Sequence, residues 1–391
     1  MWKGRFQSDR RRRVAACALA SAVSGALACG SSTDWQGTIE VRDGVEYVKN
    51  PASGMLAAED VPARIEFELE RVFGADLAPS NAILASIGAI DVDREGNVYV
   101  IDDGNDRLVS FDAGGNVRWA SGREGQGPGE LQSPSGIAWD GDSLLYVCNN
   151  RCGRLDIWST DGEFIDSHAM SAHGTQLGSV VGFVGTDALV ISSSADGVAS
   201  SRVSVLDMRE GVELVAQWTV HVSDPQDRWY SVRPPVRTVG EEIVFGDIDS
   251  YEVRFFDRNG KLRRVVSRDV DYLVGVGAAE LGEQNVFGLF SQLSPMIRLQ
   301  SGELIAYAYW TETDDPHQLM ARLFSDEGAE TTSHGSIDVF DADGRFLFAR
   351  SWTGTETPDV GRPRLVAPDG SLYTALEDPF PQVRRYRVTV R

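Results

Sequence analysis

The sequence contains few of the residues from which metal centres and disulfide-rich scaffolds are built. Among its 391 residues there are four cysteines and five histidines. No two histidines are spaced two or four residues apart, the spacing that places two metal ligands on one strand or helix. The chain also lacks a phosphate-binding loop, a Gly-x-Ser-x-Gly elbow and an HExxH helix. Nothing in the sequence therefore indicates a catalytic residue.

Lysine is also scarce, with three residues, and the overall charge is strongly acidic, at −21. The first 28 residues are an exception, because they carry six basic residues and one acidic residue. Without them the net charge of the chain is −26. A body this acidic repels phosphate backbones, so we expect no nucleic-acid partner.

The N-terminal segment has the features of an export signal. A basic stretch precedes Val14–Ala28, which has 15 residues without a charge and is too short for a permanent membrane span. The following Ala26-Leu27-Ala28-Cys29 resembles the lipobox of bacterial lipoproteins, in which the cysteine is lipidated. We therefore expect residues 1–28 to be a signal peptide and Cys29 to anchor the protein in the periplasm or at the cell surface. The outer membrane is favoured, because no Asp follows Cys29. An ordinary cleaved signal peptide is the alternative.

Two further cysteines, Cys148 and Cys152, flank a turn and lie four residues apart. An exported protein meets an oxidising compartment, which favours a disulfide between them. Free thiols and a metal site are the alternatives, although no nearby His or Cys supplies further ligands.

An internal repeat organises most of the chain. Residues 87–119 and 136–165 share the same succession of an apolar start, a Gly or Asp turn, an apolar strand, a polar loop and two more strands. Two independent markers each recur six times. The third strands end at Phe111, Trp158, Leu206, Phe256, Phe340 and Tyr386, and the second strands begin near Val98, Leu145, Leu189, Ile243, Leu304 and Leu372.

A four-stranded unit cannot bury its apolar faces alone, whereas units packed around an axis bury both. We therefore predict an all-β, six-bladed β-propeller of four-stranded antiparallel blades over residues 64–391, preceded by a tether, residues 29–63, that contains a short hairpin at Ile39–Val48. The last unit has three strands, and we predict that Arg64–Val72 closes it as the fourth. The alternative for that segment is a short amphipathic helix.

The third-strand markers of the fourth and fifth units are 84 residues apart, which indicates two insertions. Asp271–Ser294 is one, with a short helix expected at Ala278–Leu289, and Asp314–Gly335 is a polar excursion of the fifth unit. Long loops in a compact domain are often functional.

Gly125–Ala138 and the two strands that follow it resemble the NHL repeat. With its lipobox-like leader, the chain is similar to bacterial six-bladed β-propeller lipoproteins of the NHL or TolB-like kind. The similarity is specific in the first two units and extends to the others in strand pattern and count. It implies a binding platform for proteins, peptides or glycans. Relatives of this architecture also include lactonases and lyases, which hold a metal near the central axis through His, Asp or Glu.

The loops between second and third strands open on one face of such a propeller, and they are rich in acids. As a hypothesis, this face binds a cationic, peptide-like or sugar-like ligand. The alternative is that turns favour Asp and Asn wherever they occur. The candidate residues are Asp102, Asp103, Asp106, Asn149, Asn150, Arg151, Asp196, Asp247, Asp249, Trp310, Glu312, Asp314, Asp315, Glu377 and Asp378.

These features favour a non-enzymatic binding or scaffolding module of the cell envelope, with a membrane contact only through its lipid. We expect no metal and no cofactor; a calcium or other divalent ion is the alternative. Asp91–Asn97 has the composition of a calcium loop but falls where the repeat needs a turn. The alternative functions are a metal-dependent lactonase or lyase with acids near the axis, and a subunit of a larger envelope assembly.

Overall fold

The computed structural model describes most of the chain after residue 34. The described ranges are residues 35–55, 64–74, 83–173, 177–195, 200–209, 211–221, 235–247, 250–270, 291–312, 332–353, 360–377 and 379–391. Cys29, the helix expected at 278–289 and most of the insertion at 314–335 lie outside them. No helix among the described residues is long and apolar enough to cross a membrane.

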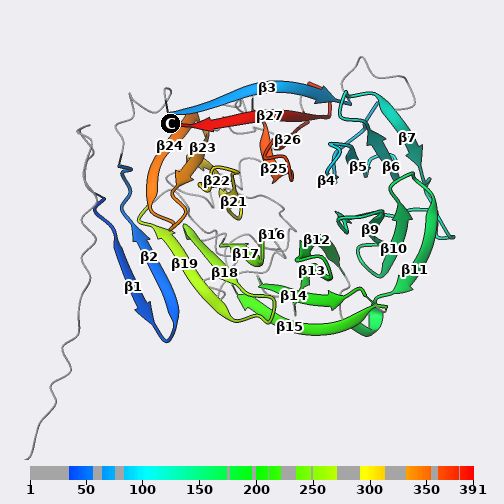
Figure 1. Ribbon diagram of the computed structural model, residues 1–391, viewed down its shortest axis with the longest axis horizontal. Helices are drawn as coiled ribbons and strands as arrows, with labels where there is room; N and C mark the ends of the chain where they lie inside the picture. Colours follow the sequence, from blue (N-terminus) through cyan, green and yellow to red (C-terminus); the bar gives the residue numbers. More distant parts are fainter. Residues whose placement is uncertain are drawn as a thin grey trace, which may run out of the picture. The chain divides into compact units, whose positions relative to one another are not determined.

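Six antiparallel sheets of at least four strands surround a common axis (Figure 1), as the repeat predicts. The first three blades contain β4 (Ala89–Val92), β5 (Val98–Asp102), β6 (Arg107–Phe111), β7 (Val117–Ser121), β8 (Ile137–Trp139), β9 (Leu144–Asn149), β10 (Arg154–Ser159), β11 (Phe164–Ala169), β12 (Gly178–Val184), β13 (Ala188–Ser194), β14 (Ser200–Asp207) and β15 (Glu213–His221). A 3-10 turn, η2 (Ser171–His173), follows the second blade.

The last three blades contain β16 (Val236–Val239), β17 (Glu242–Gly246), β18 (Glu252–Phe256), β19 (Leu262–Arg268), β20 (Ser291–Leu293), β21 (Ile297–Arg298), β22 (Leu304–Glu312), β23 (Thr332–Phe340), β24 (Phe346–Thr353), β25 (Arg362–Val366), β26 (Leu372–Leu376), β27 (Gln382–Val390) and β3 (Ile65–Phe73). In the fifth blade the innermost position is shared by β20 and β21, which both pair with β22.

Burial follows the position of a strand within its blade. Every residue of the second strand β5 is buried, whereas the outermost strand β7 alternates half-buried with exposed residues. A second strand has neighbouring strands on both edges and neighbouring blades on both faces, so it needs apolar side chains throughout. An outermost strand turns one face to solvent, so its half-buried and exposed side chains alternate along the sequence. The predicted markers at the ends of the third strands, such as Phe111 and Phe340, are fully buried.

The sixth blade is closed by the N-terminal strand β3, which pairs antiparallel with β27. This confirms the predicted closure and rules out the helix alternative. One detail differs: Leu69 is 48% exposed, although its alternation with Ile65 and Phe67 predicts an inward side chain. The register between β27 and β3 shifts beside Tyr386. Such an irregularity reverses the faces of the residues beyond it. Ile65 packs with Ile305 of the fifth blade, whereas Phe73 packs with Val109 of the first blade.

The predicted hairpin forms β1 (Thr38–Arg42) and β2 (Val45–Asn50), and it is more than a tether. Strand β2 pairs parallel with β19 and extends the fourth blade to six strands. The buried side chain of Asn50 fixes this position, because it donates to the carbonyl oxygens of Ser267 and Gly344 and accepts the amide of Phe346. The hairpin therefore belongs to the outer layer of the propeller.

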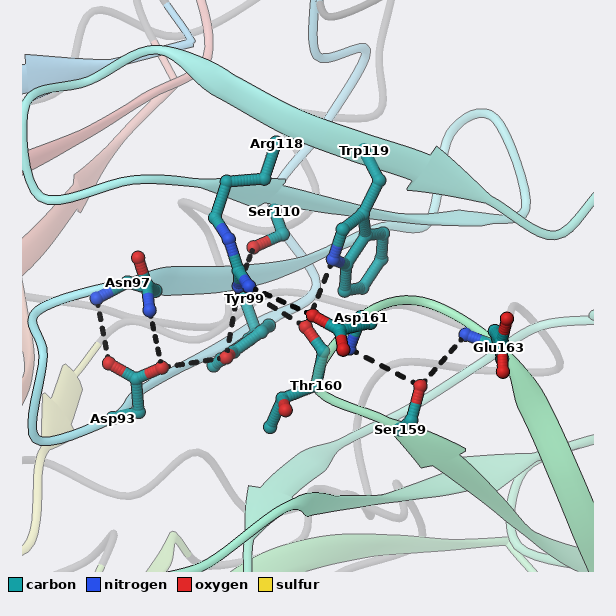
Figure 2. Close-up of polar contacts among 10 residues, drawn as sticks. All are labelled: Asp93, Asn97, Tyr99, Ser110, Arg118, Trp119, Ser159, Thr160, Asp161 and Glu163. Atoms are coloured by element: carbon teal, nitrogen blue, oxygen red, sulfur yellow. Dashed lines mark hydrogen bonds and ion pairs between the residues drawn. The ribbon is translucent and has the colours of Figure 1, made fainter.

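Neighbouring blades are joined by polar contacts at their outer strands. Figure 2 shows the contact between the first two blades, where Arg118 of β7 donates to the hydroxyls of Tyr99 and Ser110 and to the carbonyl oxygen of Thr160. The indole nitrogen of Trp119 donates to the same carbonyl at 3.0 Å. The turn between β10 and β11 is thus fastened to the blade before it.

Candidate functional site

The axis of the propeller contains a cavity of about 790 Å³. Its wall is formed mainly by first strands: β4, β12, β16, β21 and β25 all contribute, together with Trp139 at the end of β8. Much of the wall is small or aliphatic, as at Gly88 and Ala89 of the first blade, because the inner strands crowd around the axis. A cavity of this volume is large enough for a small ligand.

One carboxylate, Asp91 of β4, lines the cavity. It accepts the backbone amide of Trp139 at 2.7 Å and that of Val92 at 2.8 Å. Burial raises the pKa of Asp91 to about 6, an effect that the two amide bonds partly oppose and the nearby Asp93 reinforces. Asp91 therefore serves first as a bond between two blades.

Three arginines also line the cavity: Arg237 of β16, Arg298 of β21 and Arg364 of β25. Arg364 lies at an irregularity of β25, between Pro363 and Leu365, where it has no cross-strand partner. An extra residue of this kind redirects a side chain. Burial, with the charge of Arg364 as a second cause, lowers the pKa of Arg237 to about 9. At this pKa Arg237 stays protonated at neutral pH.

These cavity residues were missed by sequence reasoning, which looked for acids in loops. A signal was present, since Arg237 is a charged residue in a short first strand, Val236–Val239, that contains no other charge. A first strand faces the axis, so a charge there points towards a functional or strained position. That Arg237 and Arg364 lie on the same cavity could be seen only from the structure, because the two residues belong to different blades.

Three of the predicted ligand-face residues are buried in internal contacts. Asp102 is fully buried and forms an ion pair with Arg107, with 2.8 Å between its Oδ2 and the Nε atom. Asn149, also fully buried, accepts the amide of Gln132 and donates to Asp156.

Asp247 repeats the arrangement in the fourth blade. It is fully buried, and its Oδ2 atom lies 3.2 Å from the Nη2 atom of Arg254. In all three blades a polar residue at the end of the second strand binds an Arg at the start of the third, directly or through Asp156. These three side chains are engaged in contacts within their own blades and have little capacity left for a ligand.

Other predicted residues remain accessible. Asp103, Asn150 and Arg151 are exposed on the loop face, while Trp310 is half-buried and stacks on the ring of His334 at 5.4 Å between centroids. The carboxyl carbon of Asp103 lies against Gly88, a residue of the cavity wall. The loop face and the cavity therefore meet at this point.

The remaining predicted positions contribute less. Asp106 accepts the amide of Ser133, and Glu377 accepts that of Ile87 at 3.3 Å. Glu312 ends β22, and nothing is described of its side chain. Asp196, Asp249, Asp314, Asp315 and Asp378 lie outside the described residues.

Cys148 and Cys152 are joined by a disulfide in the structure, with their Cα atoms 4.4 Å apart. Both residues are fully buried; Cys148 lies in β9, and Cys152 lies in the loop between β9 and β10. Three consecutive residues, Asn150, Arg151 and Cys152, have left-handed backbone conformations, with φ of 49°, 49° and 65°. The tight turn that results brings the two cysteines together.

The described residues contain no group of three or more His, Cys, Asp or Glu side chains arranged to hold a metal ion. In the segment with the composition of a calcium loop, Asp93 accepts the amide and side chain of Asn97 and the hydroxyl of Tyr99. This is the turn that the repeat requires between the first and second strands.

The sequence matches no known protein-family profile and no curated protein. Among solved structures it is similar to a member of the DUF4221 family from Bacteroides vulgatus, with a TM-score of 0.52 and 13% identity over 84% of this chain and 99% of that one. A candidate exported protein of Bacteroides fragilis gives a TM-score of 0.50 and 11% identity over 88% and 99% of the two chains. Virginiamycin B lyase of Staphylococcus aureus gives a TM-score of 0.46 and 8% identity, over 83% of this chain and 100% of that one. This similarity is too distant to support an argument. At these identities the first two similarities establish a shared fold and no activity.

Proposed function

We propose that the protein is an exported binding or scaffolding β-propeller of the NHL-like kind, held in the cell envelope by a lipid on Cys29. Its ligand is a protein, peptide or glycan, bound on the face where the second strands end and at the adjoining mouth of the cavity. Its anchor is in the outer membrane where the cell has one.

The observation that carries this proposal is the set of buried contacts beneath the loops of this face. Asp102 binds Arg107 and Asn149 binds Asp156, both while fully buried, so the loops after β5 and β9 are held within their blades before any ligand arrives. Fixed loops lose little conformational freedom on binding, which favours affinity. The exposed Asp103 and Arg151 then offer charged groups from a prearranged surface.

The alternative, a metal-dependent lactonase or lyase, receives no support from the described part of the cavity. An axial metal would need several carboxylate or imidazole ligands. Asp91 is the carboxylate in the described cavity wall, and its two oxygen atoms already accept backbone amides.

The proposal is tested by crosslinking the lipid-anchored protein in membranes and identifying what it captures. We expect a specific partner that is lost in the double variant Asp103→Arg/Arg151→Glu. The matched control is Glu163→Lys, because Glu163 is equally exposed in the turn between β10 and β11, on the opposite face. Equal capture by all three proteins would contradict binding at the loop face.

Two measurements address the remaining parts of the proposal. Replacing the lipid site, Cys29→Ala, should move the protein from the membrane fraction to the soluble fraction. Metal analysis of the mature protein should find no stoichiometric calcium or zinc. A tightly held ion together with turnover of a lactone would favour the enzymatic alternative.

A further inference from the structure

Arg237 and Arg364 are half-buried in the cavity wall, and they lack the counter-charge that enclosed cations normally have. The Nη2 atom of Arg237 donates to the carbonyl oxygen of Pro363 at 3.1 Å, and that of Arg364 reaches the carbonyl of Ile87 at 3.5 Å. Among the described residues, neither guanidinium forms an ion pair. This is unexpected in a chain of net charge −21, where carboxylates are abundant.

Nearby carboxylates do not supply the missing counter-charge of Arg237 and Arg364. Asp103 and Glu377 lie close enough to Arg364 to stabilise its charge slightly, but burial and the neighbouring Arg362 outweigh them and lower its pKa. The Nε atom of Arg364 is buried and has no acceptor. Arg237 is affected by burial and by Arg364, and no carboxylate offsets either effect.

A purely structural role does not account for the pair. A charge that is partly withdrawn from water and has no partner is costly, and one hydrogen bond to a neutral carbonyl offsets only a part of that cost. Asp91 shares the cavity, but it forms no ion pair with either arginine, and its carboxylate is occupied by backbone amides. The missing partner is therefore something that enters the cavity.

We propose that the cavity binds the anionic group of a ligand, a carboxylate or a phosphate, between Arg237 and Arg364. This rests on the proposed binding function and gives the chemistry of its ligand. The aliphatic side chains of Val181, Val236 and Leu365 line the same cavity and suit an apolar part of the ligand. Guanidinium groups match both anions well, because their planar array of donors can bind two oxygen atoms at once.

The test uses inorganic phosphate and succinate as probes of the mature protein. Binding is followed by calorimetry and by the midpoint of thermal unfolding, with sodium chloride at equal ionic strength as the reference. We expect at least one probe to bind and to raise the midpoint; phosphate alone indicates a phosphate ligand, and succinate alone a carboxylate. Each of Arg237→Gln and Arg364→Gln should weaken binding about ten- to hundredfold, and the double variant should abolish it.

Arg298 provides a matched control within the same cavity. Its Nη2 atom lies 3.7 Å from a carboxylate oxygen of Glu242, so its charge is already paired. Arg298→Gln should therefore leave anion binding within about twofold of the original protein.

Three outcomes would overturn the inference: no effect of either probe beyond that of chloride, binding that persists in the double variant, or a double variant much less stable than the original protein in chloride. The last would show that the arginines serve the fold. If the variant with both Arg237→Gln and Arg364→Gln still captures the membrane partner, the result supports the binding function but contradicts the anion site.

Discussion

The carboxylate of Asp91 in the first blade accepts the backbone amide of Trp139 in the second, with 2.7 Å between Oδ2 and nitrogen. This bond lies in the cavity wall and connects two first strands that do not belong to the same sheet. Because the carboxylate is enclosed there, it affects stability as well as geometry.

Asp91 should make stability depend on pH. Its pKa is about 6 in the folded protein, against 3.8 when unperturbed, so the folded state holds the proton more tightly. The contribution of Asp91 to the free energy of unfolding therefore falls as pH rises from about 4 to about 6, by about 2 to 3 kcal/mol, and stays low above that. Asp91→Asn should remove this decline, which urea unfolding between pH 4 and 7 would measure. Asn can accept only one of the two amides, but that loss is independent of pH; parallel profiles for the two proteins would contradict the assignment.

Asp102 and Asp103 are neighbours in sequence with opposite surroundings, so they provide a matched pair. The side chain of Asp102 accepts from the amide of Ala85, from Asn105 and from Arg107, all within 2.9 Å. Asp102→Ala leaves these donors and a charge unsatisfied and should lower the free energy of unfolding by about 3 to 5 kcal/mol. Asp103→Ala, at an exposed position, should change it by less than about 0.5 kcal/mol. If urea unfolding gave similar losses of free energy for the two variants, the contacts of Asp102 would not stabilise the fold as proposed.

Glycines at turns set the packing between blades. Gly162, with φ of 85°, faces Trp119 of the preceding blade, and an added Cβ would lie 2.6 Å from the indole. Gly240, with φ of 61°, has nothing within 4 Å of that position. Each alanine variant should lose about 1 to 2 kcal/mol of unfolding free energy, because alanine is strained in the left-handed backbone conformation. Gly162→Ala should lose about 1 to 3 kcal/mol more, because its Cβ clashes with Trp119. Equal midpoints of thermal unfolding would mean that this contact is not tight.

The disulfide can be tested by counting thiols. Denatured, unreduced mature protein should show no reactive thiol at Cys148 or Cys152 by alkylation and mass spectrometry. Replacing both by Ser should lower the free energy of unfolding by about 2 kcal/mol, a small value because the loop closed between them is short. Alkylation of both cysteines without reductant would contradict an oxidised pair.

The fold could be predicted because its signals are local and repeated. Phe111 and Trp158 each end a buried third strand, and such markers need no knowledge of the partner strand. The role of Asn50 in joining the hairpin to the fourth blade could not be predicted, because its partners lie more than 200 residues away.

The candidate site was harder to predict for a related reason. Asp102 and Asp103 look alike in sequence, yet one is buried and the other exposed, and the difference depends on where the loop turns. Arg237 and Arg364 become a pair only when two distant blades close around the same space. A site whose residues come from different blades cannot be identified from the sequence of any one repeat.

The pairing of β3 with β27 also governs how the molecule can come into being. Residues 319 positions apart, Glu68 and Arg387, must meet before the circle is shut. The circle of blades therefore stays open, with an unpaired strand edge, until the nine-residue strand β27 pairs with β3. Because contacts between such distant residues form slowly, we expect this propeller to fold slowly.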